Sequence, residues 1–150
     1  MRSSSTYIIT IDGTSGSGKT TISKSLAKKL GFNLLDSGKL YRSAGFVYLK
    51  STESFSNINS IKEVISRITM SSNIDSNEFE ISFENKKIDH LLYSEEVSES
   101  ASIVSQIPEV RECMMKIQKL CVKGRGLIAN GRDMGTCLLY TSDAADDTRS

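Results

Sequence analysis

The chain has 150 residues and carries 19 lysines and arginines against 18 aspartates and glutamates, a formal net charge of +1. A chain of this length can bury the core of one compact domain. Its balanced charge provides no overall field that would attract nucleic acid or an anionic membrane. We therefore expect any anion-binding site to be local, and we expect neither nucleic acid nor a membrane as a partner.

The cysteines and the N-terminal segment both indicate a cytoplasmic protein. Cys113, Cys121 and Cys137 are odd in number and lack the paired spacing of metal ligands, so neither a disulfide framework nor a zinc site is expected. Residues 1–13 contain too short an apolar stretch for a secretory or membrane-spanning segment.

Three short apolar runs predict strands of a buried sheet. Residues 7–11 (YIITI) are apolar on both faces, as in a central parallel strand. Residues 32–36 (FNLLD) and 126–130 (GLIAN) predict two more strands. Since helical patterns separate these runs, the sequence predicts an α/β fold.

Two helices are predicted in the first 50 residues. Ile22, Leu26 and Leu30 recur at every fourth position after the first strand, and the following Gly31 is typical of a helix end. Residues 37–50 predict the second helix. Its expected inward positions are Leu40, Ala44, Val47 and Phe46.

The amino-acid composition changes over residues 52–93, which are rich in serine and asparagine. Alternation within residues 78–84 (EFEISFE) and a turn in residues 84–88 (ENKKI) predict a small inserted β segment. Two further helices follow, one over residues 97–104 and one that begins at Pro108 and is closed by Gly124. The chain is thus expected to divide into four segments: residues 1–51, the inserted segment of residues 52–93, residues 94–137 with the later helices and strand, and a tail of residues 138–150.

A phosphate-binding loop follows the first predicted strand. Gly13, Gly18, Lys19 and Thr20 satisfy the pattern G-x4-G-K-[ST], which arises by chance in roughly 1 of 100 to 200 chains of this length. Backbone N–H groups of such a loop converge on phosphate oxygens at the positive end of a helix. Lys19 would add a charge at the transferring phosphate, and Thr20 would offer its hydroxyl to Mg²⁺. The predicted ATP-binding residues are Gly13, Thr14, Ser15, Gly16, Ser17, Gly18, Lys19, Thr20 and Thr21.

This loop predicts a nucleotide but no particular reaction, since GTPases, ATPases and small-molecule kinases share it. Three later segments place an arginine near the cleft in which open α/β sheets bind ligands. They are residues 35–42 (LDSGKLYR), 108–112 (PEVRE) and 130–136 (NGRDMGT).

Together with IDGTSGSGKTT at residues 11–21, these motifs resemble those of the bacterial cytidylate kinases, and the resemblance extends over residues 7–136. It implies a P-loop nucleoside-monophosphate-kinase-like parallel sheet flanked by helices, with a small inserted β subdomain for the acceptor nucleotide. The implied enzyme is an ATP-dependent kinase that converts CMP or dCMP to CDP or dCDP with Mg²⁺. We expect it to be a monomer whose partners are ATP, CMP and dCMP.

The acceptor must be held by a cationic clamp, for which Arg42 and Arg132 are the natural pair. The resemblance adds Asp133 and Ser37 beside the cytosine amino group, with Ser102 and Arg111 among the donors. It also implies that Tyr41 packs near the acceptor. The catalytic residues would be Lys19 and Arg132. Taken singly, the arginines could instead form structural salt bridges, and Ser37 and Ser102 could be helix caps.

The chain departs from the family pattern at two positions within the motifs, at one position between them, and again after them. Asn130 stands where an aspartate is usual, Lys39 where a small residue is usual, and Tyr93 where an arginine is common. Residues 137–150 do not resemble the family's next strand, so we expect a non-native tail in an inactive fragment without the lid and last core elements. The rival interpretations are a kinase for another small acceptor and a non-catalytic P-loop nucleotide-binding module. His90, the only histidine, is expected at the surface.

Overall fold

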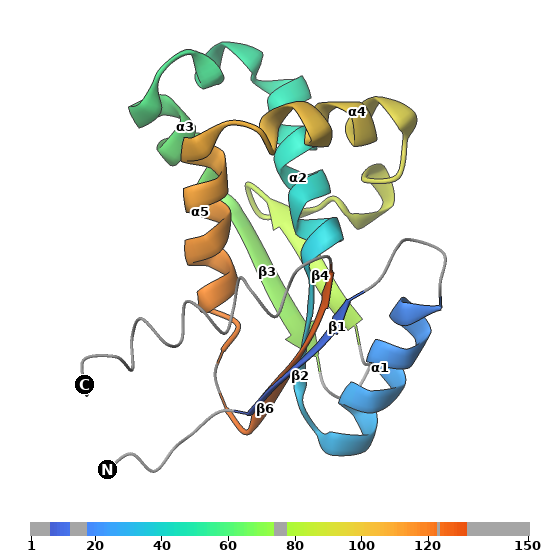
Figure 1. Ribbon diagram of the computed structural model, residues 1–150. Helices are drawn as coiled ribbons and strands as arrows, with labels where there is room; N and C mark the ends of the chain where they lie inside the picture. Colours follow the sequence, from blue (N-terminus) through green and yellow to red (C-terminus); the bar gives the residue numbers. More distant parts are fainter. Residues whose placement is uncertain (1–6, 13–17, 74–77, 123, 132–150) are drawn as a thin grey trace, which may run out of the picture. The chain divides into compact units, whose positions relative to one another are not determined.

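A computed structural model of the chain describes residues 7–12, 18–73, 78–122 and 124–131 (Figure 1). The chain divides into two compact units. The first comprises residues 1–37, 72–79 and 117–150, and the second comprises residues 38–71 and 80–116. Both contain buried hydrophobic residues.

A three-stranded parallel sheet forms the centre of the first unit. β6 (Gly126–Gly131) lies between β1 (Tyr7–Asp12) and β2 (Asn33–Asp36), and both pair with it in parallel. Every residue of β6 is buried, because a central parallel strand is covered on both faces. These strands confirm the sequence prediction to within one residue at each end.

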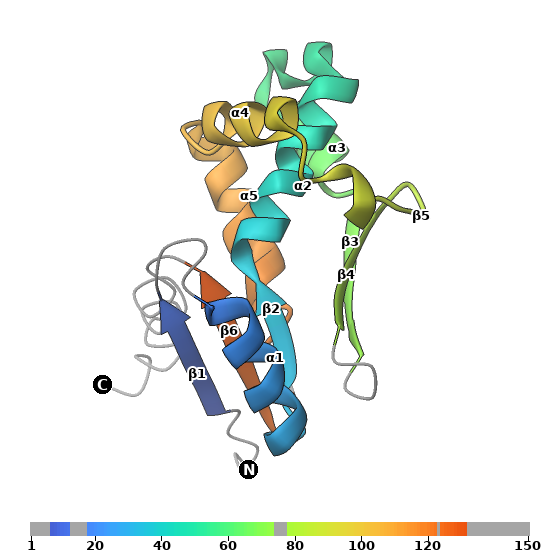
Figure 2. The same cartoon turned by 90° about the vertical axis from the view of Figure 1, so that its right-hand side faces the viewer.

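The helix after the predicted phosphate loop, α1 (Lys19–Leu30), covers one face of this sheet (Figure 2). It ends at Gly31, whose φ of 68° lies in the left-handed region that favours glycine. Of the apolar positions that predicted this helix, Ile22 is 55% exposed. Ser23 and Ala27 are buried instead, because small side chains allow the helix to approach the sheet closely.

Helices provide much of the core of the second unit, to which most of α2 (Ser37–Lys50) and α5 (Pro108–Lys119) and all of α4 (Glu95–Val104) belong. The predicted helices are confirmed, but α5 ends before Gly124. The buried positions on the three helices are Leu40, Ala44, Phe46, Val47, Val97, Ala101, Val104, Val110 and Met114.

α2 and α4 touch through their backbones. A β-carbon added to Gly45 of α2 would lie 2.5 Å from the Ala101 nitrogen and 2.7 Å from the Val97 oxygen of α4. These distances are too short for any side chain, so the close approach of the two helices requires glycine at this position.

A second sheet contains β3 (Ile68–Asn73), β4 (Glu78–Phe83) and β5 (Lys86–Lys87), in that order. The alternation predicted for β4 is confirmed, since its three apolar residues are buried. The predicted turn to β5 is present as well, and both Glu84 and Asn85 adopt positive φ values there, 53° and 69°.

The sequence predicted a small inserted β segment within residues 52–93, but the structure of this stretch is mixed. It also contains η1 (Thr52–Ser56), α3 (Ile58–Ile65) and the short helix η2 (Asp89–Leu91). The Asn57 side chain caps α3 by accepting the Ser60 N–H at 2.9 Å. The buried residues of α3, Ile61, Val64 and Ile65, have helical spacing. The sequence did not predict this helix, because the run is short and lies among polar residues.

The described residues contain neither a membrane-spanning helix nor a metal-binding cluster. No helix there is both long and apolar enough to cross a membrane. No cluster of three or more His, Cys, Asp or Glu residues in that part of the chain is suited to hold a metal ion.

Candidate nucleotide-binding site

The donor side of the predicted site begins at the N-terminus of α1. Gly18 precedes the helix with φ 83° and ψ 4°, a left-handed conformation that explains the need for glycine at the end of the loop. Thr20 and Thr21 are exposed in the first turn, which contains no acidic residue. The partial positive charge of this helix end is therefore not offset by a carboxylate in that turn. Residues 13–17 and the Lys19 side chain lie outside the described part.

The carboxyl edge of the parallel sheet lies at the same end of the first unit. Asp12 is the last residue of β1 and pairs in register with Gly131, while Asp36 at the end of β2 pairs with Asn130. Since the chain passes directly from β1 into the loop before α1, these residues and the start of α1 share one edge of the sheet. Ligands of open α/β folds bind at this edge.

Asn130 has an unsatisfied polar atom. The residue is 3% exposed, and its buried Oδ1 accepts no hydrogen bond among the residues that the structure describes. Together with the Thr20 hydroxyl and the carboxylates of Asp12 and Asp36, this edge provides oxygen donors, the ligands that suit Mg²⁺. The residues thus fit a hydrated Mg²⁺ shared with nucleotide phosphates better than an ion held by protein carboxylates alone.

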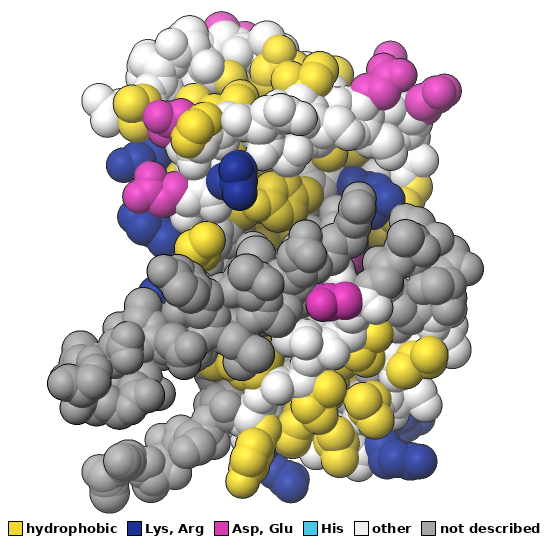
Figure 3. All heavy atoms as spheres, in the orientation of Figure 1, with side chains coloured by type: hydrophobic (Ala, Val, Ile, Leu, Met, Phe, Trp, Pro, Cys, Tyr) yellow, Lys and Arg dark blue, Asp and Glu magenta, His cyan; other side chains and the backbone are white. Residues whose placement is uncertain are grey.

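The acceptor-side residues come from three helices. Ser37 begins α2 and is buried, and Tyr41 and Arg42 on the same helix are half-buried. Ser102 on α4 and Arg111 on α5 are exposed. Figure 3 shows basic side chains (dark blue) beside hydrophobic ones (yellow) on the helices of the second unit.

The contact between α2 and α4 brings two of the predicted acceptor-side positions into the same region of the second unit. Arg42 lies one turn before Gly45, and Ser102 directly follows Ala101, the residue that Gly45 approaches. Ser102 is not a helix cap, because Ser94 and Ser105 occupy the cap positions of α4. Ser37 stands at a helix start, so the capping alternative stays open for it. Arg132 and Asp133 lie outside the described residues.

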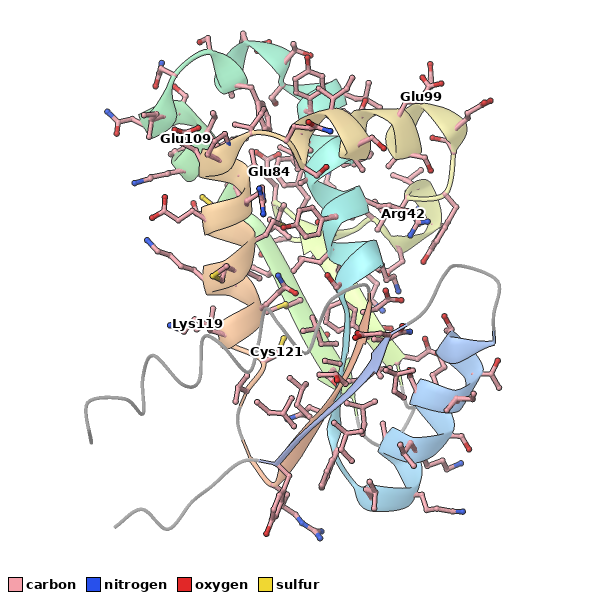
Figure 4. All side chains as sticks on the ribbon, viewed as in Figure 1. Arg42, Glu84, Glu99, Glu109, Lys119 and Cys121 are labelled. Atoms are coloured by element: carbon pink, nitrogen blue, oxygen red, sulfur yellow. The ribbon has the colours of Figure 1, made fainter. Side chains whose placement is uncertain are left out.

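Arg42 and Arg111 form no ion pair with any residue that the structure describes. The Cζ atom of Arg42 lies 5.2 Å from the centre of the Tyr93 ring, and Figure 4 shows Arg42 extending from α2 beside the segment that leads into α4. Arg67, which was not predicted as a site residue, shows the contrasting case. Its guanidinium contacts Glu63 and Glu84 at 2.8 Å, and the hydrogen bonds to these carboxylates raise its pKa.

Lys39 is mostly buried and forms an ion pair. Its Nζ lies 2.6 Å from Oδ2 of Asp89, and only 13% of its side chain is exposed. The Ile81 N–H donates to the same carboxylate, at 3.2 and 3.3 Å from its two oxygens. Sequence reasoning gave no role to Asp89 and noted Tyr93 only as a departure, because nothing local pairs them with residues of α2 about 50 positions earlier. His90 is exposed, as predicted.

With this geometry established, a comparison with protein families is decisive. A family model described as cytidylate kinase matches residues 9–145. The chain belongs to the cytidylate kinase family. The matched range extends into residues 138–150, and the expectation that this tail is non-native stays a prediction.

Curated relatives carry the same name. A cytidylate kinase of Shewanella loihica is 38% identical over 138 residues, which cover 91% of this chain and 60% of the relative. One of Caldicellulosiruptor saccharolyticus is 39% identical over 131 residues, covering 87% and 58% respectively. One of Vibrio cholerae is 34% identical over 142 residues, covering 95% and 63%. The chain thus spans about three fifths of the length of these relatives.

Proposed function

We propose that the full-length protein containing this chain transfers the γ-phosphoryl group of ATP to CMP or dCMP, giving CDP or dCDP and ADP. The observation that carries the proposal is that Arg42 and Arg111, predicted to bind the acceptor, hold no carboxylate among the described residues. Arginines that are not neutralised within the protein can bind a phosphate dianion.

On the donor side, the N-terminus of α1 and the loop before it would hold the ATP phosphates, with Lys19 at the transferring group. Thr20 would bind Mg²⁺, and the Asn130 amide and the carboxylates of Asp12 and Asp36 would face its water shell. The metal ion neutralises charge on the phosphates when it is bound. No side chain needs to act as a nucleophile, because phosphoryl transfer depends on positioning and charge neutralisation.

On the acceptor side, Arg42, Arg111 and Arg132 would hold the monophosphate in line with the donor. Asp133 would accept a hydrogen bond from the cytosine amino group, with Ser37 and Ser102 completing the contacts to the base and Tyr41 packing beside it. Uracil has a carbonyl in place of that amino group, so it would leave the Asp133 carboxylate without this hydrogen bond.

The proposal is tested by an ADP-release assay of the full-length protein with CMP, dCMP, UMP, AMP and shikimate as acceptors. We expect ADP release that depends on Mg²⁺ and is fastest with CMP or dCMP. Release that is fastest with shikimate or AMP would assign the protein to another acceptor. Nucleotide binding without any acceptor-dependent release would favour a non-catalytic module.

A further inference from the structure

Lys39 and Arg42 form a pair of cations one turn apart on α2, and residues three apart lie on the same side of a helix. Both contact one short stretch of chain, residues 89–93, which we call the η2 segment. Lys39 meets the carboxylate of Asp89 at 2.6 Å, whereas Arg42 lies under the ring of Tyr93 at 5.2 Å. One cation is therefore paired with an anion and the other with an aromatic ring.

The Lys39 contact holds the segment in place. Asp89 is bound at once by the Lys39 ammonium and by the Ile81 N–H of β4. Leu92, next to Tyr93, is fully buried, with 0% of its surface exposed. These two anchors fix the backbone on the N-terminal side of Tyr93. The anchored backbone thus places Tyr93 beside Arg42, and its ring lies 5.2 Å from the guanidinium carbon although Tyr93 itself is 60% exposed.

The two contacts differ in how much of the charge and of the N–H donors of each cation they leave available for a ligand. A carboxylate neutralises its cation and occupies an N–H donor, so the Lys39 charge is compensated within the protein. An aromatic face attracts a guanidinium through its quadrupole and leaves the formal charge and the in-plane N–H donors unoccupied. A ring thus limits the rotamers of an arginine without competing with an anionic ligand, and fewer rotamers must be lost on binding.

We propose that Tyr93 is a positioning residue for the acceptor phosphate: its ring holds the Arg42 guanidinium in its binding orientation while leaving the charge free for the phosphate. The inference rests on the proposed function in one respect, namely that Arg42 binds the acceptor phosphate. It adds a residue outside the predicted site motifs and gives it a defined task.

The test compares Tyr93→Phe, which keeps the ring, with Tyr93→Leu, which removes it, and with Tyr93→Glu, which places a carboxylate beside Arg42. Tyr7→Leu changes an exposed tyrosine on β1 and is the matched control. In the full-length protein we expect Tyr93→Leu to raise KM for CMP about three- to tenfold while KM for ATP and the melting temperature stay unchanged. Tyr93→Glu should raise KM for CMP further, and Tyr93→Phe should retain the original KM.

A second measurement is independent of kinase activity. Nitrogen-15 relaxation of the Arg42 Nε–H group, without ligand, should show increased mobility in Tyr93→Leu and not in Tyr93→Phe or Tyr7→Leu. Unchanged mobility in Tyr93→Leu, or equal increases in KM for ATP and CMP, would overturn the positioning role. If the original protein showed no CMP-dependent turnover, the proposed function and the phosphate role of Arg42 would both fail, yet the relaxation data would still decide whether Tyr93 orders Arg42.

Discussion

Gly45 faces the backbone of Ala101 so closely that a β-carbon added to it would lie 2.5 Å from the Ala101 nitrogen. In Gly45→Ala we expect overpacking to cost about 3 kcal/mol, the upper end of its usual range, because the contact is this short. The gain of roughly 1 kcal/mol that alanine brings to a helix interior leaves a net destabilisation of about 2 kcal/mol. Urea unfolding measures the difference, and Ser98→Ala at an exposed position of α4 is the control. An increase in stability for Gly45→Ala would show that the two helices can separate at little cost.

Lys19 is predicted to supply the charge at the transferring phosphate. In the full-length protein, Lys19→Ala should lower kcat at least about 10²-fold, the scale for removing one preorganised charge from a phosphoryl-transfer site. Steady-state kinetics with saturating ATP and CMP measures the effect. Lys28→Ala, at an exposed position in the last turn of α1, should leave kcat unchanged. Full kcat in Lys19→Ala would remove this lysine from the mechanism.

Asp133 is predicted to read the cytosine amino group. Asp133→Ala in the full-length protein should lower kcat/KM for CMP at least about tenfold more than for UMP, because only cytosine offers a proton donor at that position. UMP serves as the internal control. Equal losses for the two pyrimidines would indicate that Asp133 supports the fold or the arginines instead.

Cys113 on α5 provides a test by pH. Burial, together with the charge of Glu112, raises the pKa of its thiol. A thiol reacts as the thiolate, so a raised pKa leaves less reactive Cys113 at mildly alkaline pH and shifts the increase in reactivity to higher pH. Iodoacetamide labelling, followed site by site with mass spectrometry, should thus reach its half-maximal rate at higher pH in the folded chain than in urea. A shift to lower pH would contradict the burial of this thiol.

Regular elements were predictable because their patterns are local. The apolar runs of β1 and β6 and the inward stripe of α2 are each complete within a few turns or one strand. α3 was missed because its apolar face is only eight residues long and lies in a polar stretch. The exposure of Ile22 could not be predicted, because periodicity alone cannot tell which side of a helix carries the small residues that fit against a sheet.

In the candidate site, too, the residues that belong to local motifs could be predicted and those that depend on long-range contacts could not. Motif residues such as Gly18 and Arg42 could be chosen from sequence, since their spacing and neighbours carry the signal. Their partners could not, because the contacts of Lys39 with Asp89 and of Arg42 with Tyr93 join positions about 50 residues apart that only the folded chain brings together.

The buried amide of Asn130 leads us to expect that stability and function make opposite demands at the carboxyl edge of the sheet. A buried acceptor without a partner costs the folded state about 1–3 kcal/mol. Asn130→Leu replaces the amide by an apolar group with the same number of heavy atoms and the same branching. It should thus raise the urea midpoint of the chain, while in the full-length protein it should lower kcat. A higher urea midpoint together with a lower kcat would show that the amide is kept for the proposed nucleotide site at the expense of stability.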